Sequence, residues 1–448
     1  MANFSKSNVP QFSVDVYQNE YLPEGGREVN AIVTVSATGG GTVGSAIAAP
    51  HLYPAGQAPD AAVAIMVDCS GSMDYPPAKM RGAREATAAA IDAVRDGVHF
   101  AVISGTHAAQ EVYPGNGALA VADARTRDQA KQALRRLSAG GGTAIGTWLR
   151  LADRLLSSAD VSIRHGILLT DGRNEHESPE DLKAALDSCA GRFTCDARGV
   201  GTDWEVKEVT AIASGLLGTA DIVADPAALS ADFTQMMETA MGKEVADVAL
   251  RLWTPVGTEI KFVKQVAPTV EELTHRRTEA GPRAGDYPTG SWGDESRDYH
   301  VCVEVPSAGI GREMLAARVS LVIPQSDGSV QNLGAQGLVR AVWTEDMVAS
   351  TSINPQVAHY TGQAELAQVI QQGLDARKAG DVDGATAKLG RAVQLASASG
   401  NADTAKLLAK VVDVVDAAAG TVRLKARVEE ADEMTLETRS TKTVRVKK

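Results

Sequence analysis

The chain has 448 residues, of which 44% are hydrophobic and 22% charged, a balance typical of globular proteins long enough for several domains. Its formal net charge of −12 argues against nucleic acid as a partner, because an acidic surface repels a phosphate backbone. The four cysteines lack Cys-x-x-Cys spacing, which predicts neither a zinc knuckle nor a disulfide framework; Cys189 and Cys195 are expected to be reduced thiols.

The N-terminal residues lack the charged start and apolar run of a signal peptide. No run of about 18 apolar residues, the length that spans a bilayer, occurs later. We therefore expect a cytoplasmic protein with no membrane partner.

Residues 11–37 alternate between apolar and polar side chains around a turn at Glu24-Gly25-Gly26, the pattern of a β-hairpin. A hairpin by itself is only marginally stable in water. The strands within 1–59 are therefore expected to complete a sheet formed elsewhere in the chain.

Residues 60–242 alternate short apolar runs with helical segments, which predicts a doubly wound, Rossmann-like α/β domain with a parallel sheet. The expected strands are 62–67, 99–104, 166–170, 194–199 and 220–224. The expected helices lie near 79–95, 126–137, 144–157, 179–188, 204–214 and 227–241.

Residues 243–350 return to strand-like alternation, as in His300-Val301-Cys302-Val303-Glu304-Val305. Together with the strands of 1–59 they predict a β-sandwich into which the α/β domain is inserted.

Residues 360–420 have apolar positions at helical spacing, with breaks at Ala379-Gly380-Asp381 and Ser399-Gly400-Asn401. They predict a C-terminal helical bundle that resembles a tetratricopeptide helix pair. Residues 421–448 end in several basic side chains and are expected to be mobile. Threonines in such a tail could be phosphorylated and bound by a phosphothreonine reader, with a plain disordered end or an added strand as the alternatives.

The chemistry is concentrated at Asp68-Cys69-Ser70-Gly71-Ser72, which directly follows a buried strand. Ligands bind at the carboxyl ends of strands in open α/β sheets. A carboxylate and two hydroxyls within five residues supply the hard oxygen donors that Mg²⁺ prefers. Because aspartate and serine also cap helices, this motif alone is only moderately specific.

Two further segments complete a pattern. Gly140-Gly141-Gly142-Thr143 precedes a predicted helix, and Thr170-Asp171-Gly172 ends another buried strand. Over residues 61–242 the chain resembles the von Willebrand factor type A (vWA) family, of the intracellular bacterial type. Asp68, Ser70, Ser72, Thr143 and Asp171 match its metal-ion-dependent adhesion site.

The resemblance implies that the hydroxyls of Ser70, Ser72 and Thr143 coordinate Mg²⁺ directly and that Asp68 and Asp171 act partly through water. Mn²⁺ or Ca²⁺ would suit the same oxygens. Since hydroxyl ligands are neutral, the metal stays electrophilic. A protein partner that presents Asp or Glu would complete its coordination.

Signatures of catalysis, such as a Walker A loop, a His-Glu-x-x-His pair or a nucleophile elbow, do not occur in the sequence. Glu175-His176-Glu177 is expected to form a solvated acidic loop rather than part of the metal site. We therefore expect a metal-dependent protein-interaction module and not an enzyme. The alternative is a non-catalytic accessory subunit of an ATPase-driven metal-insertion or remodelling enzyme.

Overall fold

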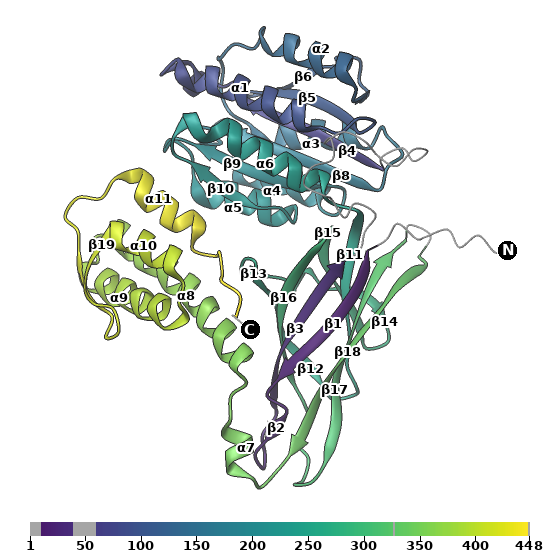
Figure 1. The fold of residues 1–448 in the computed structure, drawn as a ribbon, viewed down its shortest axis with the longest axis vertical. Helices are drawn as coiled ribbons and strands as arrows, with labels where there is room; N and C mark the ends of the chain where they lie inside the picture. Colours follow the sequence, from purple (N-terminus) through teal and green to yellow (C-terminus); the bar gives the residue numbers. More distant parts are fainter. Residues whose placement is uncertain (1–9, 39–59, 326–327, 447–448) are drawn as a thin grey trace, which may run out of the picture. The chain divides into compact units, whose positions relative to one another are not determined.

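The computed structural model describes residues 10–38, 60–325 and 328–446. The chain divides into two compact units (Figure 1). Of the described residues, the α/β unit comprises 60–246 and 290–293, and the second unit comprises 10–38, 247–289, 294–325 and 328–446. The α/β unit is therefore inserted, along the chain, between parts of the second unit.

A seven-stranded sheet forms the centre of the α/β unit, in the order β10-β9-β8-β4-β5-β6, with β7 beside β5. Its strands are β4 (Ala61–Asp68), β5 (His99–Gly105), β6 (Ala109–Tyr113), β7 (Ala120–Val121), β8 (Ile163–Thr170), β9 (Thr194–Val200) and β10 (Ala220–Val223). The predicted strands are present and pair in parallel. Strands β6 and β7, which pair antiparallel with β5, were not predicted, because short edge strands lack a long apolar run.

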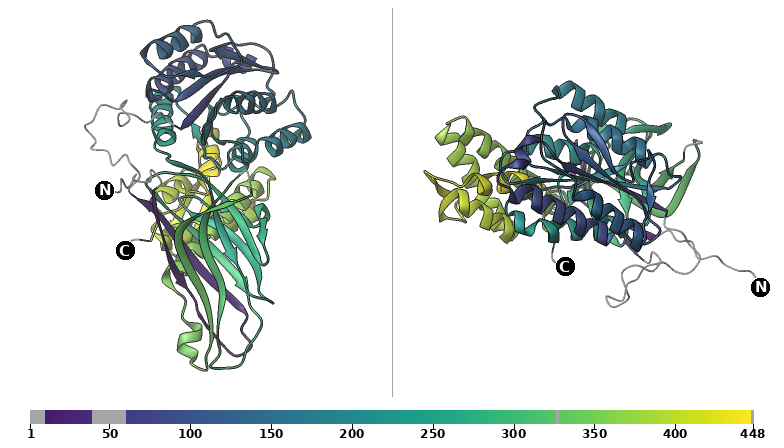
Figure 2. Two further views of the ribbon diagram at one scale, coloured as in Figure 1. Left: turned by 90° about the vertical axis from the view of Figure 1, so that its right-hand side faces the viewer. Right: turned by 90° about the horizontal axis from the view of Figure 1, so that it is seen from above.

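Helices cover both faces of this sheet (Figure 2). They are α1 (Ala78–Ala93), α2 (Ala124–Leu134), α3 (Ile145–Leu156), α4 (Pro179–Cys189), α5 (Val206–Gly215) and α6 (Leu229–Met241). Two short 3-10 helices, η1 (Gly71–Asp74) and η2 (Pro226–Ala228), precede α1 and α6. All six lie where the apolar periodicity predicts them, with ends shifted by a few residues.

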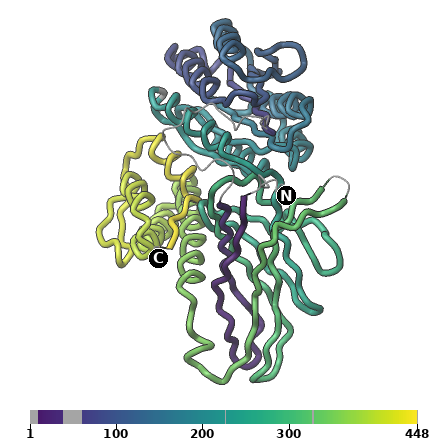
Figure 3. Tube along the Cα trace, turned by 45° about the vertical axis from the view of Figure 1, so that its right-hand side comes forward, coloured from purple at the N-terminus to yellow at the C-terminus, as the bar shows by residue number. Residues whose placement is uncertain are grey.

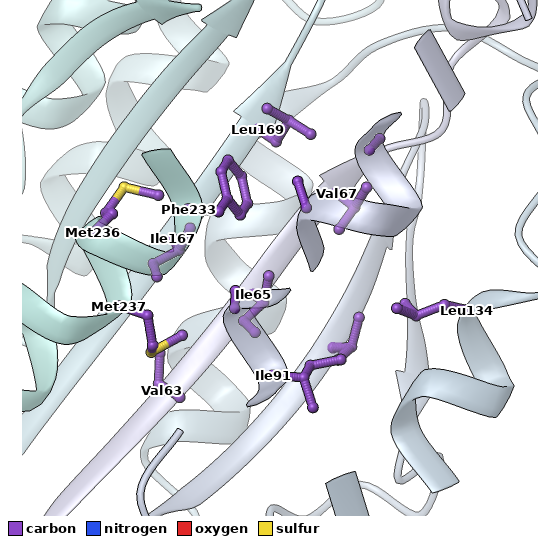
Figure 4. Packing of buried hydrophobic residues seen from close by; sticks show 14 of the residues in the cluster. Val63, Ile65, Val67, Ile91, Leu134, Ile167, Leu169, Phe233, Met236 and Met237 are labelled. Atoms are coloured by element: carbon purple, nitrogen blue, oxygen red, sulfur yellow. The ribbon is translucent and has the colours of Figure 1, made fainter. Parts of the chain in front are cut away.

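Every second residue of β4 points into the hydrophobic core on the face of the sheet that α1 and α6 cover. Val63, Ile65 and Val67 are fully buried and pack with Ile91 of α1 and Phe233 of α6 (Figure 4). Each such burial contributes about 1.5–3 kcal/mol. The next strand along the chain, β5, lies on one side of β4, whereas β8 and β9 lie on the other side. The direction of winding thus reverses between β4 and β8, and ligands bind at such a switch point in open α/β sheets.

The second unit contains two large sheets, ordered β1-β3-β16-β12-β13 and β14-β15-β11-β17-β18-β2, and a two-stranded sheet near its C-terminal end. The N-terminal strands are β1 (Gln11–Gln18), β2 (Tyr21–Leu22) and β3 (Glu28–Thr38). The later strands are β11 (Val245–Trp253), β12 (Glu259–Ala267), β13 (Glu271–Glu272), β14 (Thr278–Gly281), β15 (Ala284–Trp292), β16 (Glu295–Glu304), β17 (Glu313–Pro324) and β18 (Val330–Trp343). A third 3-10 helix, η3 (Thr274–Arg276), lies between β13 and β14.

The N-terminal strands complete sheets made by much later residues, as predicted. β3 pairs antiparallel with β16, from Glu28 opposite Glu304 to Ala37 opposite Glu295, and the purple strands lie among later ones in Figure 3. β2 instead pairs in parallel with β18 in the other sheet. The two sheets face each other where β1 meets β18, because a Cβ on Gly337 would lie 2.6 Å from Val16 Cγ2.

The C-terminal part of this unit is mainly helical. It contains α7 (Met347–Thr351), α8 (Pro355–Lys378), α9 (Val382–Ser399), α10 (Ala402–Val411), β19 (Val412–Asp416), β20 (Thr421–Leu424) and α11 (Glu430–Arg439). The breaks expected at Gly380 and Gly400 are present, and both glycines have positive φ. Residues 412–416 form a strand rather than the end of a helix, since β-branched Val412, Val414 and Val415 favour extended backbone. Among the described helices, none is long and apolar enough to cross a membrane.

The expectation of a mobile tail is wrong for residues 421–446. Val422 and Leu436 are buried in one cluster with Ile370 of α8 and Leu389 of α9. A charged segment with few apolar residues can still be ordered when those residues pack against another part of the fold, here α8 and α9. The local sequence pattern does not predict such packing. Thr438 is buried, whereas Thr435, Thr441 and Thr443 are half-buried, so a phosphothreonine reader of this segment stays a prediction.

All four cysteines are free and buried. The prediction of reduced thiols at Cys189 and Cys195 is thus confirmed. Burial raises the pKa of Cys69 to about 12, and the negative charge of Asp68 acts in the same direction, so this thiol stays protonated beside the candidate site.

Candidate metal-binding site

The five predicted donors come from three loops of the α/β unit. Asp68 is the last residue of β4, and Asp171 directly follows β8. Ser70 and Ser72 lie between β4 and α1, and Thr143 precedes α3. Since β4 and β8 are neighbouring parallel strands, their carboxyl ends lie at one edge of the sheet.

Asp68 is fully buried and held by three donors. Its Oδ1 accepts a hydrogen bond from the backbone N of Ser70 at 2.8 Å. Its Oδ2 accepts from the Thr170 hydroxyl at 2.7 Å and from the backbone N of Asp171 at 3.4 Å. The Asp68 carboxylate therefore links the β4 loop to the β8 loop.

Two serines and Asp171 form a continuous polar chain. Ser70 Oγ and Ser72 Oγ lie 2.9 Å apart, and the Ser72 hydroxyl donates to Asp171 Oδ1 at 2.7 Å. Ser70 and Asp171 are buried, whereas Ser72 is half-buried. The structure thus brings together four of the five predicted residues by direct hydrogen bonds.

Thr143 joins the group through the glycine loop. Gly71 N donates to Gly141 O at 2.9 Å, and Gly140 N donates to Cys69 O at 2.8 Å, so the two loops pair by their backbones. Gly141 has a φ of 80°, a conformation that favours glycine. A Cβ on Gly172 would lie 2.9 Å from Ser72 Oγ and 3.6 Å from Thr143 Oγ1, so both hydroxyls approach the same point.

Glu175 and His176 are exposed and Glu177 is half-buried, so this loop is solvated as expected, but His176 and Glu177 also contact the loop that carries Thr143 and the start of α3. His176 Nδ1 accepts from Thr143 N at 3.2 Å, and His176 N donates to Thr143 O at 3.0 Å. Glu177 Oε2 accepts from Gly146 N at 2.8 Å and from the Asn174 amide at 2.9 Å. These bonds satisfy backbone donors at the start of α3, which have no partner within the helix, and they fix the backbone of Thr143.

Lys79 also belongs to this site, although it was not predicted from the sequence. Its ammonium, on a side chain that is 9% exposed, donates to Asp171 Oδ2 at 2.7 Å and to Asp203 Oδ2 at 3.0 Å. Burial lowers the pKa of Lys79, but the hydrogen bonds to Asp171 and Asp203 outweigh it and raise the pKa above its usual value. A lysine in the first turn of α1 opposes the helix dipole, and this was a signal that it pairs with a carboxylate.

Asp68 has no such cationic partner among the described residues, since no ion pair involves it. Burial raises the pKa of Asp68 above its usual range, against the lowering effect of its hydrogen bonds from Ser70 and Thr170. The negative charge of Asp171 adds to the rise. A buried carboxylate in this position gains from a nearby cation.

The donor set fits a hard divalent cation. Hydroxyl and carboxylate oxygens suit Mg²⁺, and the charge environment of Asp68 favours a cation. Within the described ranges no three His, Cys, Asp or Glu side chains form a metal-ligand group, so any site here depends on its hydroxyl donors.

Comparisons with known proteins agree with this architecture. Models of the von Willebrand factor type A domain and of the von Willebrand factor type A C-terminal domain match residues 61–222 and 394–440. A von Willebrand factor type A protein from Catenulispora acidiphila is 52% identical, with a TM-score of 0.91 over 99% of both chains. No curated protein gives a significant match.

More distant structures share the fold alone. The ArnB paralog VWA2 from Sulfolobus acidocaldarius is 13% identical, with a TM-score of 0.59 over 96% of this chain and 98% of its own. The human COPII-coat protein Sec24c is 9% identical, with a TM-score of 0.53 over 86% of this chain and 57% of its own. The identity and the coverage of the Catenulispora protein show that this chain belongs to the von Willebrand factor type A family.

Proposed function

We propose that the chain is a cytoplasmic, non-catalytic interaction protein that binds Mg²⁺ through Asp68, Ser70, Ser72, Thr143 and Asp171. A protein partner contributes an Asp or Glu carboxylate to the metal. The observation that carries this proposal is the polar chain from Ser70 through Ser72 to Asp171, beside a buried Asp68 that has no cationic partner among the described residues.

The chemistry supports recognition rather than turnover. The donor set offers three neutral hydroxyls and only two carboxylates, so a bound Mg²⁺ would retain affinity for another anionic oxygen. Mg²⁺ releases its water reluctantly, and a site with few protein ligands binds it weakly when no partner is present. By linkage, the partner and the metal strengthen each other's binding by the same factor.

The test is titration calorimetry of Mg²⁺ into the full chain and into Asp68→Ala. The variant removes one of the two carboxylates of the donor set, and we expect it to lose Mg²⁺ binding. Because Asp68 lies at the end of β4, we expect the variant to keep its fold. Asp187→Ala is the control, because it removes one carboxylate from the exposed surface of the same unit. Equal Mg²⁺ uptake by the wild type and Asp68→Ala would contradict the proposal.

Partner binding is tested by affinity capture from native cells with Mg²⁺ and again with chelator. We expect the partner only in the Mg²⁺ sample, and its capture should fail with Asp68→Ala. A partner captured equally well in chelator would show that the interaction does not use the metal. An ATPase among the captured proteins would identify the complex as a remodelling or metal-insertion assembly.

A further inference from the structure

Lys79 places a fixed positive charge inside the candidate metal site. The two oxygens of Asp171 have different partners: Oδ1 accepts from the Ser72 hydroxyl, and Oδ2 accepts from the Lys79 ammonium, both at 2.7 Å. Asp171 has no exposed surface, so water screens this ion pair poorly. Lys79 also donates to the backbone O of Ser72 at 3.4 Å, so it contacts the loop that carries two of the donors.

The second carboxylate partner of Lys79 does not cancel this charge at the site. Asp203 belongs to the loop between β9 and α5, and its side chain is 68% exposed. Solvent screens the charge of an exposed carboxylate. The electrostatic effect of Lys79 on the buried donors therefore exceeds that of Asp203.

The charge of Lys79 leaves the buried donor group with an excess of positive charge when a divalent cation is bound. Asp68 and Asp171 would neutralise the cation if they were the only charges within the donor group. With Lys79 included, the buried group and its cation carry one net positive charge. One carboxylate from outside restores neutrality, and burial strongly favours the neutral arrangement.

We propose that Lys79 makes the metal site selective for an anionic partner: it weakens metal binding in the free protein and strengthens the attraction of the bound metal for an added carboxylate. This inference rests on the proposed function, because it presupposes that a cation binds at the donor set. The inference predicts that substitution of Lys79 by an uncharged residue strengthens metal binding and weakens the binding of a carboxylate to the bound metal. A lysine that only supported the fold would affect both in the same direction.

The experiment uses Mn²⁺ as the metal probe, followed by electron paramagnetic resonance of the free ion, and acetate as the carboxylate probe. The full chain is compared with Lys79→Met, which removes the charge, and with Lys79→Gln, which removes the charge but keeps a donor for Asp171. Lys183→Met is the control, because it removes one positive charge from an exposed pair with Asp187. Circular dichroism establishes that each variant is folded, and Lys79→Gln carries the comparison if Lys79→Met does not fold.

We expect both Lys79 variants to bind Mn²⁺ about tenfold or more tightly than the wild type, since a nearby like charge has been removed. Acetate in place of chloride, at constant ionic strength, should raise the Mn²⁺ affinity of the wild type and of Lys183→Met but not that of the Lys79 variants. Unchanged or weaker Mn²⁺ binding by both Lys79 variants, or an equal response to acetate in all proteins, would overturn the inference. Absence of Mn²⁺ binding by the wild type would instead overturn the proposed function.

Discussion

Gly172 leaves space for the hydroxyls of the candidate site. The point where its Cβ would lie is 2.9 Å from Ser72 Oγ, closer than real Cβ atoms approach a neighbour. A methyl group there would displace the Ser72 hydroxyl, which has two polar partners, Ser70 and Asp171. The glycine of Thr170-Asp171-Gly172 is therefore a requirement of the donor geometry.

We predict that Gly172→Ala weakens Mg²⁺ binding about tenfold or more, because coordination by hydroxyl oxygens tolerates little displacement. The measurement is Mg²⁺ titration calorimetry, with urea unfolding to confirm that the variant is folded. Gly140→Ala is the matched control, since a Cβ there meets nothing within 4 Å. Equal Mg²⁺ affinities for the two variants would contradict this prediction.

His300 of β16 makes the stability of the second unit depend on pH. It is buried, its Nε2 lies 2.8 Å from Asn30 Oδ1, and its ring packs edge-on against Phe262. Burial lowers the pKa of His300 to about 4, and the positive charge of Lys264 acts in the same direction. An unfolded histidine titrates near pH 6.5.

Between these values the unfolded chain binds more protons than the folded chain, so the free energy of unfolding falls as the pH falls from about 6.5 to 4. The expected loss from His300 is about 3 kcal/mol, complete below its folded pKa. Urea unfolding at several pH values, for the wild type and His300→Gln, measures it. Parallel curves for the two proteins would show that His300 does not contribute.

At the scale of elements, the C-terminal segment is attached to the first sheet of the second unit. Asp298 of β16 is buried and accepts from Tyr360 of α8 at 2.5 Å, from Thr34 of β3 at 2.6 Å and from Arg445 Nε at 2.9 Å. One carboxylate thus joins two strands, a helix and the chain beyond α11. This long-range network orders residues that look mobile when only their local sequence is considered.

We predict that Arg445→Met lowers the free energy of unfolding by about 1–2 kcal/mol. Breaking a fully buried pair costs about 3–5 kcal/mol, but Arg445 is 44% exposed and Asp298 keeps its bonds from Tyr360 and Thr34. Urea unfolding is the measurement, with Lys410→Met as control, because its pair with Asp432 is more exposed and is worth at most about 1 kcal/mol. Equal effects of the two substitutions would contradict the role assigned to Arg445.

At the scale of the whole molecule, each unit has a hydrophobic core of its own. The proposed metal donors all belong to the α/β unit. Mg²⁺ at about 100 times its dissociation constant should stabilise the unit that binds it by about 2.7 kcal/mol.

We therefore predict two transitions in scanning calorimetry, of which Mg²⁺ raises the temperature of one. That transition should not respond to Mg²⁺ in Asp68→Ala. The transition that Mg²⁺ leaves unchanged should be the one that Arg445→Met lowers. A single transition that Mg²⁺ shifts as a whole would show that the two units unfold together.

The sequence by itself predicted the elements whose physical signal is local. The apolar runs of β4 and β8 mark strands buried on both faces, and the positions of Asp68 and Asp171 after them follow from chain order alone. The insertion of the α/β unit also followed, because a lone N-terminal hairpin needs a sheet to join. Ser70 and Ser72 were candidates because two hydroxyls follow Asp68 at the end of a predicted strand, and Thr143 was added because the resemblance to the vWA family implies it.

Only the tertiary structure decided the contacts between distant residues. The pairing of Lys79 with Asp171 depends on how the fold brings the start of α1 to the end of β8, and the contact of His176 with Thr143 depends on where the β8 loop meets the loop before α3. The C-terminal segment is ordered because Arg445 binds the buried carboxylate of Asp298, which lies 147 positions earlier in the chain. Local patterns record propensity and amphipathicity, whereas a buried charge is stabilised by whichever partner the fold brings within a few ångströms, and that proximity has no local signal.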